Sequence, residues 1–368
     1  MKKRVLFLAQ HFTTLYLFRR ELIKKLCQDG HEVFISLPES DENKFFEDLG
    51  CKIINTKVDR RGVNPFKDIS LIHFYKKMIP KIDPDIIFSY TIKPNIYCAI
   101  ATKGKKRKNG QPFRQVCNIT GTGGTFLKEN LLSKLCRLLY RHSIRYSYKV
   151  FFQNTDNRDM FIKHKMVGDN YEMIPGSGVN LEEFSLVELP DDKITKYIFV
   201  GRLLRIKGVY DYLDAARVIK SKYPNTEFYI AGFTDEECCS KKIKEYSDYV
   251  IPLGFINDIS ERIKKCHCTV LPSHGGEGVP NAILESSAMG RVCIGSNIPG
   301  TRDVIDDGIT GFLFEPGDVD GLIKAIEKSF DMTLQQKSEM GLAARRKVEK
   351  EFDRQIVIDK YLKEVEMA

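Results

Sequence analysis

The sequence predicts an α/β protein with two doubly wound parallel-sheet domains. Short apolar runs such as Val5–Ala9 and Lys196–Val200 alternate with amphipathic stretches along nearly the whole chain, and this alternation is typical of repeated βαβ units. The series restarts after the polar, proline-led stretch Pro190–Lys193, which is typical of a linker. Because 368 residues are enough for two separate cores, we expect domains at 1–188 and 189–352.

Composition and charge narrow the classes of function. The ten cysteines show no C-x-x-C and no zinc-ligand spacing, so reduced thiols in a cytosolic protein fit best. No apolar stretch approaches the roughly 20 residues that span a bilayer. Residues 1–180 hold 32 Lys and Arg against 17 Asp and Glu, a net charge of +15 in a chain of +9. A basic half suits an anionic membrane surface or nucleic acid, but the basic–aromatic interleaving of a nucleic-acid site is missing.

Strands and helices are expected in regular alternation in the first half. The predicted strands are Val5–Ala9, Glu32–Pro38, Cys51–Ile54, Asp85–Ser89, Gln115–Ile119 and Lys149–Phe152. The predicted helices are Leu17–Asp29, Phe66–Ile79, one from Asn95, Leu131–Tyr148 and Thr155–His164. The dinucleotide fingerprint G-x-G-x-x-G is absent from the first turn, where Gln10–Thr14 stands. This absence argues against a simple NAD-dependent dehydrogenase.

Candidate site residues of the first half lie where strands end, because open α/β sheets bind ligands at the carboxyl ends of their strands. They are His11, Thr91, Lys93, Asn118, Thr120, Gly121 and Gly123. The last three belong to a glycine cluster that would expose its backbone to a substrate. A solvated loop lysine is an equally weighted interpretation of Lys93.

Two basic segments of the first half bear on a membrane partner. The predicted helix Leu131–Tyr148 carries cations along one face, with leucines mostly on the others, as do helices that lie at a membrane interface. A salt-bridged surface helix is the commoner interpretation. For the basic loop Lys103–Gly110, a solvated surface loop is the preferred interpretation, and contact with anionic lipid headgroups is the alternative.

The second half begins a new βα series with a basic first turn. Gly201 opens this turn, and Arg202, Arg205 and Lys207 precede the predicted helix Tyr210–Tyr223. Arginine and lysine both stabilise phosphate oxygens, so the turn is a candidate diphosphate cradle, with a solvated basic turn as the alternative. The further strands are Glu227–Gly232, Val250–Gly254, Cys268–Pro272, Arg291–Gly295 and Thr310–Phe314, followed by helices at Val319–Asp331, Leu334–Glu351 and Asp353–Val365.

The segment Ser273–Gly290 carries the densest set of candidate ligand contacts. It follows an apolar strand, three glycines open its loop, and Pro280 is placed as a first helical residue. Free N–H groups and the positive end of the helix dipole make such a turn an anion site. Glu277 and Glu285 would repel a bare phosphate, so we expect them to bind hydroxyls, as on a sugar and a ribose. A structural βα turn with two solvated glutamates explains the local pattern equally well.

Short motifs of glycine, proline and charged residues follow one another in a distinctive order. They are Gly30-His-Glu-Val33, Gly201-Arg-Leu-x-x-x-Lys207-Gly208, Glu277-Gly-x-Pro280, Glu285-x-x-Ala-x-Gly290, Pro299-Gly300 and Asp307-Gly-x-x-Gly-Phe312. This combination resembles family 4 of the retaining glycosyltransferases, which have the GT-B fold, and the resemblance covers nearly the whole chain. It implies two Rossmann-like domains facing a central cleft, with the final helix, about 353–368, packing back on the first domain.

The resemblance also implies roles for individual residues. Arg202 and Lys207 would hold the diphosphate of a nucleotide sugar, and Glu277 would bind hydroxyls of its sugar; these three would be the catalytic residues. The other donor-binding residues would be Gly201, Arg205, Gly278, Val279, Pro280, Asn281 and Glu285, with Glu285 on the ribose. Such enzymes need no metal and no other cofactor, because Arg, Lys and helix termini stabilise the departing diphosphate.

One departure from the family pattern points to a subgroup. Many members carry a histidine after the strand Val116–Ile119, but Thr120 stands here, so histidine-based roles do not transfer. The loop Asn118-x-x-Gly-x-Gly123 and the segment Thr91-x-Lys-Pro94 are similar to enzymes that assemble capsule, O-antigen or protein glycans on polyprenyl diphosphate.

The function expected from the resemblance is sugar transfer with retained configuration from a UDP-sugar to a lipid-linked acceptor. An N-acetylhexosamine is the expected sugar. The enzyme would be cytoplasmic and peripheral on the inner face of the cell membrane, held there by its basic N-terminal half, with no nucleic-acid partner. A UDP-N-acetylglucosamine 2-epimerase of the same fold is the alternative.

Overall fold

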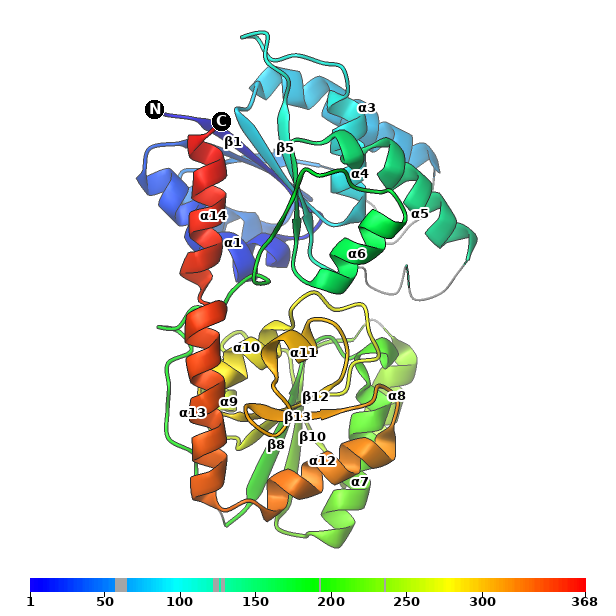
Figure 1. Cartoon of the computed structure of the whole chain (residues 1–368), viewed down its shortest axis with the longest axis vertical. Coiled ribbons are helices and arrows are strands. Elements are labelled where there is room, and N and C mark those ends of the chain that lie inside the picture. Colours follow the sequence, from blue (N-terminus) through cyan, green and yellow to red (C-terminus); the bar gives the residue numbers. More distant parts are fainter. Residues whose placement is uncertain (57–64, 122–125, 127–129, 192, 235) are drawn as a thin grey trace. The chain divides into compact units, whose positions relative to one another are not determined.

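The chain folds into two compact units. The computed structural model describes residues 1–56, 65–121, 126, 130–191, 193–234 and 236–368. The N-terminal unit consists of Met1–Gly121, Lys128–Ser177 and Val357–Ala368, and the C-terminal unit is built on Gly178–Ile356. In each unit helices cover both faces of a parallel sheet (Figure 1), as the alternating sequence pattern predicts.

The sheet of the N-terminal unit has, among the described residues, seven parallel strands in the order β3-β2-β1-β4-β5-β6-β7. They are β1 (Arg4–Leu8), β2 (Glu32–Leu37), β3 (Lys52–Asn55), β4 (Ile86–Tyr90), β5 (Arg114–Ile119), β6 (Lys149–Phe152) and β7 (Tyr171–Met173). All side chains of β4 are buried, as expected for a strand that is covered on both faces. The strand order reverses between β1 and β4, which places a topological switch point at the carboxyl ends of these two strands.

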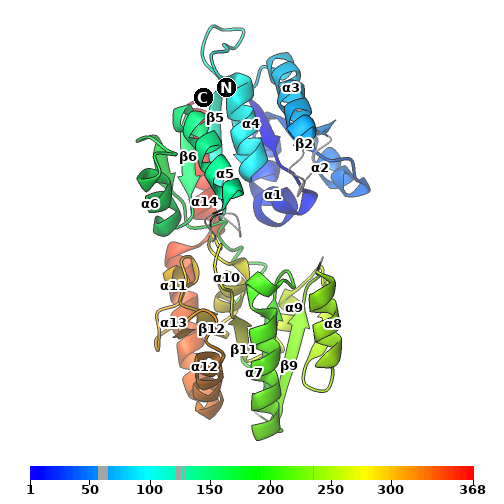
Figure 2. The same ribbon diagram turned by 90° about the vertical axis from the view of Figure 1, so that its right-hand side faces the viewer.

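Two groups of helices cover this sheet. On one face lie α1 (Phe12–Gln28), α2 (Lys44–Asp48) and α14 (Arg354–Glu366), which share a core with the strands. On the other face lie α3 (Pro65–Ile82), α4 (Ile92–Thr102), α5 (Leu131–His142) and α6 (Thr155–Lys163) (Figure 2). Two 3-10 turns complete the described helices of the unit, η1 (Asp41–Asn43) and η3 (Ile144–Tyr146). None of the described helices is long and apolar enough to cross a membrane.

Four predicted helix boundaries are wrong by three or more residues, and one of them is the end of α3, which continues to Ile82 instead of ending at Ile79. Helix α1 begins at Phe12 rather than Leu17, because Phe12 and Leu15 are buried in the core and make the first turn part of the packed face. Helix α4 begins at Ile92, so Lys93 lies in a helix and not in a loop. Helix α5 ends at His142, and η3 takes up the rest of the predicted helix.

In its described part, the C-terminal unit repeats the architecture with a six-stranded parallel sheet in the order β10-β9-β8-β11-β12-β13. Its strands are β8 (Thr195–Val200), β9 (Thr226–Ala231), β10 (Ile251–Gly254), β11 (Cys268–Leu271), β12 (Val292–Ser296) and β13 (Gly311–Phe314). Its helices are η4 (Arg205–Lys207), α7 (Val209–Lys222), α8 (Glu237–Glu245), α9 (Ser260–Ile263), α10 (Asn281–Ala288), α11 (Thr301–Val304), α12 (Val319–Asp331) and α13 (Leu334–Glu351). The predicted bounds of α12 and α13 are confirmed.

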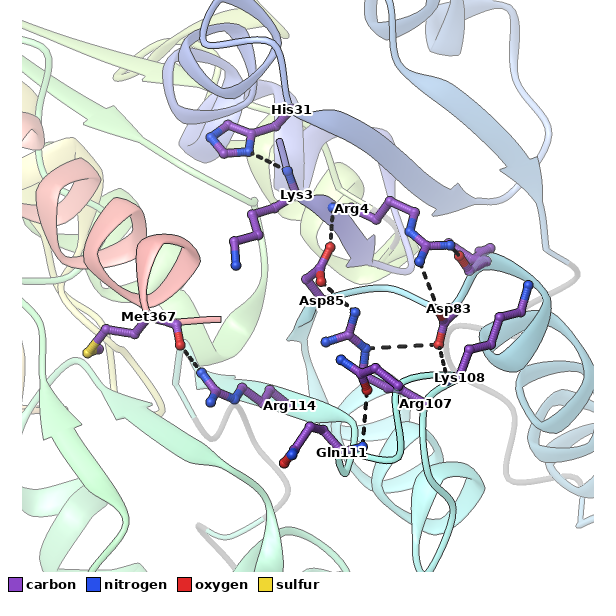
Figure 3. A network of polar contacts seen from close by, with 12 residues as sticks. Lys3, Arg4, His31, Asp83, Asp85, Arg107, Lys108, Gln111, Arg114 and Met367 are labelled. Carbon is purple, nitrogen blue, oxygen red and sulfur yellow. Dashed lines mark hydrogen bonds and ion pairs between the residues drawn. The ribbon is translucent and has the colours of Figure 1, made fainter. Parts of the chain in front are cut away.

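The basic loop Lys103–Gly110 is partly an internal structural element. Its Arg107 is buried, with Nη2 at 2.5 Å from Asp85 Oδ1, while Asp83 accepts hydrogen bonds from Arg4 and from the backbone N–H of Lys108 (Figure 3). These contacts tie the loop to the amino ends of β1 and β4. One of the five cations of the loop is therefore a structural side chain and not a free surface charge.

Candidate functional site

Two βα turns of the C-terminal unit lie side by side. Strands β8 and β11 are neighbours in the sheet, and the strand order reverses between them, so the turns that follow them share a switch point. The first turn runs from Gly201 through η4 to Gly208, and the second turn runs from Pro272 to Pro280. The sequence motifs that predict a diphosphate cradle and a sugar site thus meet at one edge of one sheet.

Glycines allow these turns to make backbone contact. Gly208 has a left-handed φ of +73°, and a Cβ there would lie 1.8 Å from the carbonyl oxygen of Pro272. Gly300, with a φ of +84°, approaches the second turn in the same way, since its Cβ would lie 1.5 Å from the Gly278 carbonyl oxygen. Any other residue at these positions would meet both backbone strain and a steric clash.

Lys207 and Glu277 form an ion pair across the two turns. Lys207 Nζ lies 2.5 Å from Glu277 Oε1, and Ser273 Oγ donates to the same oxygen at 2.8 Å. The two charged side chains are only 19% and 10% exposed, so the pair is shielded from solvent screening. The result is an oriented carboxylate beside an ammonium group, which suits a polar ligand that carries both hydroxyls and negative charge.

His274 adds a second ionisable pair beside the first. Its Nε2 lies 2.8 Å from Asp211 Oδ2 in the first turn of α7, and its backbone N–H donates to the Ile206 carbonyl at 2.8 Å. The Asp211 side chain is nearly buried, whereas the His274 side chain is 38% exposed. Together with the Ser273 Oγ, which donates to the Ile206 carbonyl at 3.4 Å, these contacts hold the loop after β11 against η4 and α7.

The two arginines of the first turn differ in their surroundings. The Arg202 side chain is half-buried and has no ion pair or hydrogen bond with the described residues. Arg205 is exposed, its guanidinium lies 5.1 Å from the centre of the Tyr210 ring, and its backbone N–H donates to Glu236 Oε2 at 3.0 Å. Arg202 is therefore the more available of the two for an anionic ligand.

The second turn leads into α10 much as the sequence predicts. Pro280 is the N-cap of α10, with φ −74° and ψ 117°, and not its first helical residue. Val279 and Pro280 are buried, so they can offer a ligand their backbone only. Asn281 and Glu285 are half-buried in the first two turns of α10, and Asn281 Oδ1 has no hydrogen-bond partner among the described residues.

The switch point of the N-terminal unit holds a strained contact between Gln10 and Thr91. Thr91 Oγ1 donates to Gln10 Oε1 at 2.9 Å, and Thr91 has φ 71° and ψ 168°, a region that is essentially restricted to glycine. Gln10 is buried, and its Nε2 has no hydrogen-bond partner among the described residues. His11 follows in extended conformation, with Nδ1 at 2.6 Å from Thr13 Oγ1. Strain and an unsatisfied donor at a strand end are features of functional sites.

Lys93 and Asn118 are engaged within the N-terminal unit. Lys93 Nζ lies 2.7 Å from Asp68 Oδ1. Asn118 is buried; its Nδ2 donates to the Ser89 carbonyl at 3.1 Å, and its Oδ1 accepts from the Tyr361 hydroxyl of α14. Both side chains thus hold their surroundings in place, and a contact with substrate stays a prediction for each.

The remaining candidates of this unit follow β5. Thr120 and Gly121 are half-buried at the end of that strand, and Gly121 has a φ of +125°. Gly123 lies outside the described residues. Their part in substrate binding stays a prediction.

Gln10 and Asp211 belong to these clusters but are absent from the sequence-based predictions, whereas Ser273 and His274 lie in the predicted site segment without a predicted role of their own. His274 and Gln10 lie just after the carboxyl ends of strands, and this position alone could have marked them as candidate site residues. Asp211 lies within a predicted helix, and only the tertiary contact with His274 reveals it.

A potential metal-ligand group lies beside Arg205. Within the described ranges, ligand atoms of Glu236, Cys238 and Cys239 come within 4.8 Å of one another. Glu236 already accepts the Arg205 N–H and the Cys239 thiol, and burial raises the pKa of Cys239 to about 12. A neutral thiol is a poor metal ligand, so these residues serve here to hold the first turn.

Two family profiles match the chain. Residues 4–154 match the profile described as "Glycosyl transferase 4-like", and residues 195–331 match that described as "Glycosyl transferases group 1". The fold and the paired turns define a glycosyltransferase of the GT-B class. The chain belongs to the glycosyltransferase family that these two profiles describe, family 4, as the sequence motifs indicate.

Relatives and solved structures agree with this assignment. The chain is 26% identical to the N,N'-diacetylbacillosaminyl-diphospho-undecaprenol alpha-1,3-N-acetylgalactosaminyltransferase of Campylobacter jejuni, over 98% of this chain and 97% of that protein. It is 29% identical to a UDP-Gal:alpha-D-GlcNAc-diphosphoundecaprenol alpha-1,3-galactosyltransferase of Escherichia coli, over 74% and 73%. HepE of Anabaena, solved in complex with UDP and glucose, superposes with a TM-score of 0.80 at 16% identity over the whole of both chains. A glycosyltransferase from Rickettsia africae has a TM-score of 0.79 at 19% identity, over 100% of this chain and 98% of that one. These matches do not favour the epimerase alternative.

Proposed function

We propose that this glycosyltransferase moves a sugar from a UDP-sugar to a polyprenyl-diphosphate-linked acceptor and retains the configuration of the sugar. The observation that carries the proposal is the cluster at the switch point of the C-terminal unit, where Lys207, Glu277 and Arg202 come from two adjacent turns. The names of the Campylobacter and Escherichia relatives, both of which include a diphospho-undecaprenol acceptor, support the acceptor class. An N-acetylhexosamine is the proposed sugar.

The chemistry follows from the charges of the cluster. Arg202 and Lys207 neutralise the diphosphate as it departs, and the positive end of the α10 dipole adds to them. Glu277 Oε1 already accepts two hydrogen bonds, an arrangement that fits a fixed acceptor for sugar hydroxyls better than a nucleophile. Attack from the face that the diphosphate leaves, with the leaving phosphate taking the acceptor proton, gives retention without a protein nucleophile. Because protein cations supply the charge stabilisation, we propose that no metal is required.

Donor class is tested by calorimetric titration of the full chain with UDP, GDP and ADP, followed by turnover of UDP-sugars with a prenyl-diphosphate-linked sugar. UDP should bind most tightly, and UDP should be released only when the acceptor is present. Lys207→Ala should weaken UDP binding by roughly 10- to 100-fold, since charged hydrogen bonds contribute about 1.5–3 kcal/mol. Lys222→Ala, which removes an exposed cation of the same unit, is the matched control. Absence of UDP binding, or equal losses in both variants, would contradict the assignment.

Two further measurements test retention and metal independence. NMR of the first product should show the same anomeric configuration as the donor sugar. Activity should be unchanged after EDTA treatment. Inversion at the anomeric carbon, or loss of activity that Mg²⁺ restores, would contradict these two parts of the proposal separately.

The membrane part of the proposal rests on α5. Its buried side chains are Ser133, Cys136 and Tyr140, whereas four of its five leucines are exposed. Leu131, Leu132, Leu135 and Leu138 are 85%, 42%, 52% and 51% exposed, and Lys134 and Arg141 are exposed beside them. Exposed leucines next to cations suit the interface of a bilayer with anionic lipids. We propose that α5 holds the enzyme on the inner face of the cell membrane, where a lipid-linked acceptor is found.

Vesicle co-sedimentation tests this surface. Wild type should bind vesicles that contain phosphatidylglycerol more tightly than pure phosphatidylcholine vesicles, and salt should weaken the binding. The double variant Leu135→Ser/Leu138→Ser should bind at least about tenfold more weakly, since burial of one leucine contributes roughly 1.5–3 kcal/mol. Ile309→Ser, an exposed apolar position of the C-terminal unit, is the control. Unchanged vesicle binding by the leucine variant would rule out α5 as the membrane contact.

A further inference from the structure

The pair formed by His274 and Asp211 has no counterpart among the motifs that identify the family. His274 follows β11 in the loop that carries Glu277, and Asp211 lies in the first turn of α7. The 2.8 Å contact between Nε2 and Oδ2 joins residues 63 positions apart in the chain. Both elements belong to the C-terminal unit, so the pair is defined by one compact body.

The surrounding backbone fixes where the imidazole can lie. The His274 N–H donates to the Ile206 carbonyl, directly before Lys207, and Ser273 Oγ donates to the Glu277 carboxylate. The ring therefore lies near the amino end of α7, on a loop whose next charged residue, Glu277, pairs with Lys207 of η4. The charged group in contact with the ring is Asp211 on α7.

The two ring nitrogens of His274 have different surroundings. Nε2 is committed to Asp211, whereas Nδ1 has no hydrogen-bond partner among the described residues, and the side chain is 38% exposed. A carboxylate bound to one ring nitrogen fixes the orientation of the imidazole. In an imidazolium ring both nitrogens donate, so Nδ1 of such a ring can donate to a ligand.

We propose that His274, oriented by Asp211, is an additional phosphate-binding residue whose Nδ1–H donates to an oxygen of the donor diphosphate. This inference rests on the proposed UDP-sugar donor. A phosphate oxygen is the expected partner because the ring lies beside the basic turn that carries Arg202 and Lys207 and beside a helix amino end. In this arrangement Asp211 is a positioning residue, since it acts through the imidazole.

Titration of UDP, UMP and uridine against the full chain tests the inference. His274→Gln should weaken UDP binding roughly tenfold, because the variant lacks the ring donor to the phosphate oxygen. Uridine affinity should be unchanged, since uridine has no phosphate. Asp211→Asn should weaken UDP binding in the same direction, and the double variant should be no weaker than His274→Gln alone. His73→Gln, an exposed histidine on α3, is the control and should match wild type.

Two results would overturn the inference while leaving the proposed donor intact. One is UDP affinity of His274→Gln equal to that of wild type. The other is an equal loss for UDP and uridine, which would show that the pair merely supports the loop. A wild-type chain that binds no UDP overturns the proposed donor class itself, and this inference with it.

Discussion

Replacement of Gly208 by alanine tests whether contact between the two turns determines the geometry of the site. Gly208 separates Lys207 from α7 and has φ +73° and ψ 27°. An added Cβ would lie 1.8 Å from the carbonyl oxygen and 2.6 Å from the carbonyl carbon of Pro272. Both atoms are backbone, so no side-chain rotation relieves the clash, and either η4 or the loop after β11 must move.

The loss of stability expected for Gly208→Ala is the sum of a backbone contribution and a packing contribution. A left-handed conformation at a residue with a Cβ raises the free energy by roughly 1–2 kcal/mol. Overpacking in a close-packed region typically adds about 1–3 kcal/mol. Gly317 isolates the backbone contribution, because it has φ +80° and no atom within 4 Å of its added Cβ. We therefore expect Gly208→Ala to destabilise the chain by about 2–5 kcal/mol and Gly317→Ala by about 1–2 kcal/mol.

Urea unfolding of both variants measures this difference, and UDP titration measures its functional consequence. Because Ser273 directly follows Pro272 and Glu277 lies in the same loop, a shift of the second turn separates Glu277 from Lys207, and Gly208→Ala should lose UDP affinity. Gly317→Ala should keep UDP affinity, since it lies in the exposed turn before α12. Equal destabilisation by the two substitutions would refute the reasoning, because it would mean that the close approach to Pro272 adds nothing beyond the backbone conformation.

Three further predictions concern buried polar groups. Burial lowers the pKa of His267 to about 4. In the unfolded chain this histidine is protonated at an ordinary pKa of about 6.5. The free energy of unfolding should therefore fall by up to roughly 3 kcal/mol as the pH drops from about 6.5 to 4. Urea melts across this range should show the slope, and His267→Asn should flatten it. Tyr361→Phe removes a hydroxyl that accepts from Arg19 and donates to Asn118, and should destabilise the chain by about 1–3 kcal/mol in the same assay; a loss below the error of the melt would contradict this. Arg107→Met removes the charged hydrogen bond to Asp85, while Asp83 keeps Arg4, and should destabilise the chain by about 1.5–3 kcal/mol. Lys108→Met on the same loop should change the stability by no more than about 0.5 kcal/mol.

Much of the fold was predictable because strand and helix patterns are local. The apolar runs that read as strands form the two parallel sheets, and α12 and α13 have the expected bounds. The start of α1 was not predictable from periodicity, because Phe12 and Leu15 continue the buried face across polar threonines. Periodicity also failed to show which face of α5 is buried: Ser133, Cys136 and Tyr140 pack inward, and four of the five leucines are exposed.

The site was predictable in its location but not in its pairings. The rule that ligands bind at the carboxyl ends of strands brought Arg202, Lys207 and Glu277 to one edge of a sheet. The ion pair between Lys207 and Glu277 joins residues 70 positions apart, and no local pattern indicates such a partner. Gln10 and Thr91, 81 positions apart, are a second pair of this kind. Such contacts depend on strand order, which the sequence leaves open.

Under the proposed function, the Lys207–Glu277 ion pair links the binding of the diphosphate to the binding of the sugar. Without donor, each charge neutralises the other in a shielded position, where an unpaired charge would raise the free energy by several kcal/mol. A diphosphate that enters the basic turn competes with Glu277 for the Lys207 ammonium group. Glu277 then shares Lys207 with the diphosphate, and hydroxyls of the donor sugar can donate to the Glu277 carboxylate in its place. Binding of the diphosphate and binding of the sugar should therefore favour each other. The ratio of UDP-sugar affinity to UDP affinity should be larger in wild type than in Glu277→Gln, because an amide at this position forms no ion pair with Lys207.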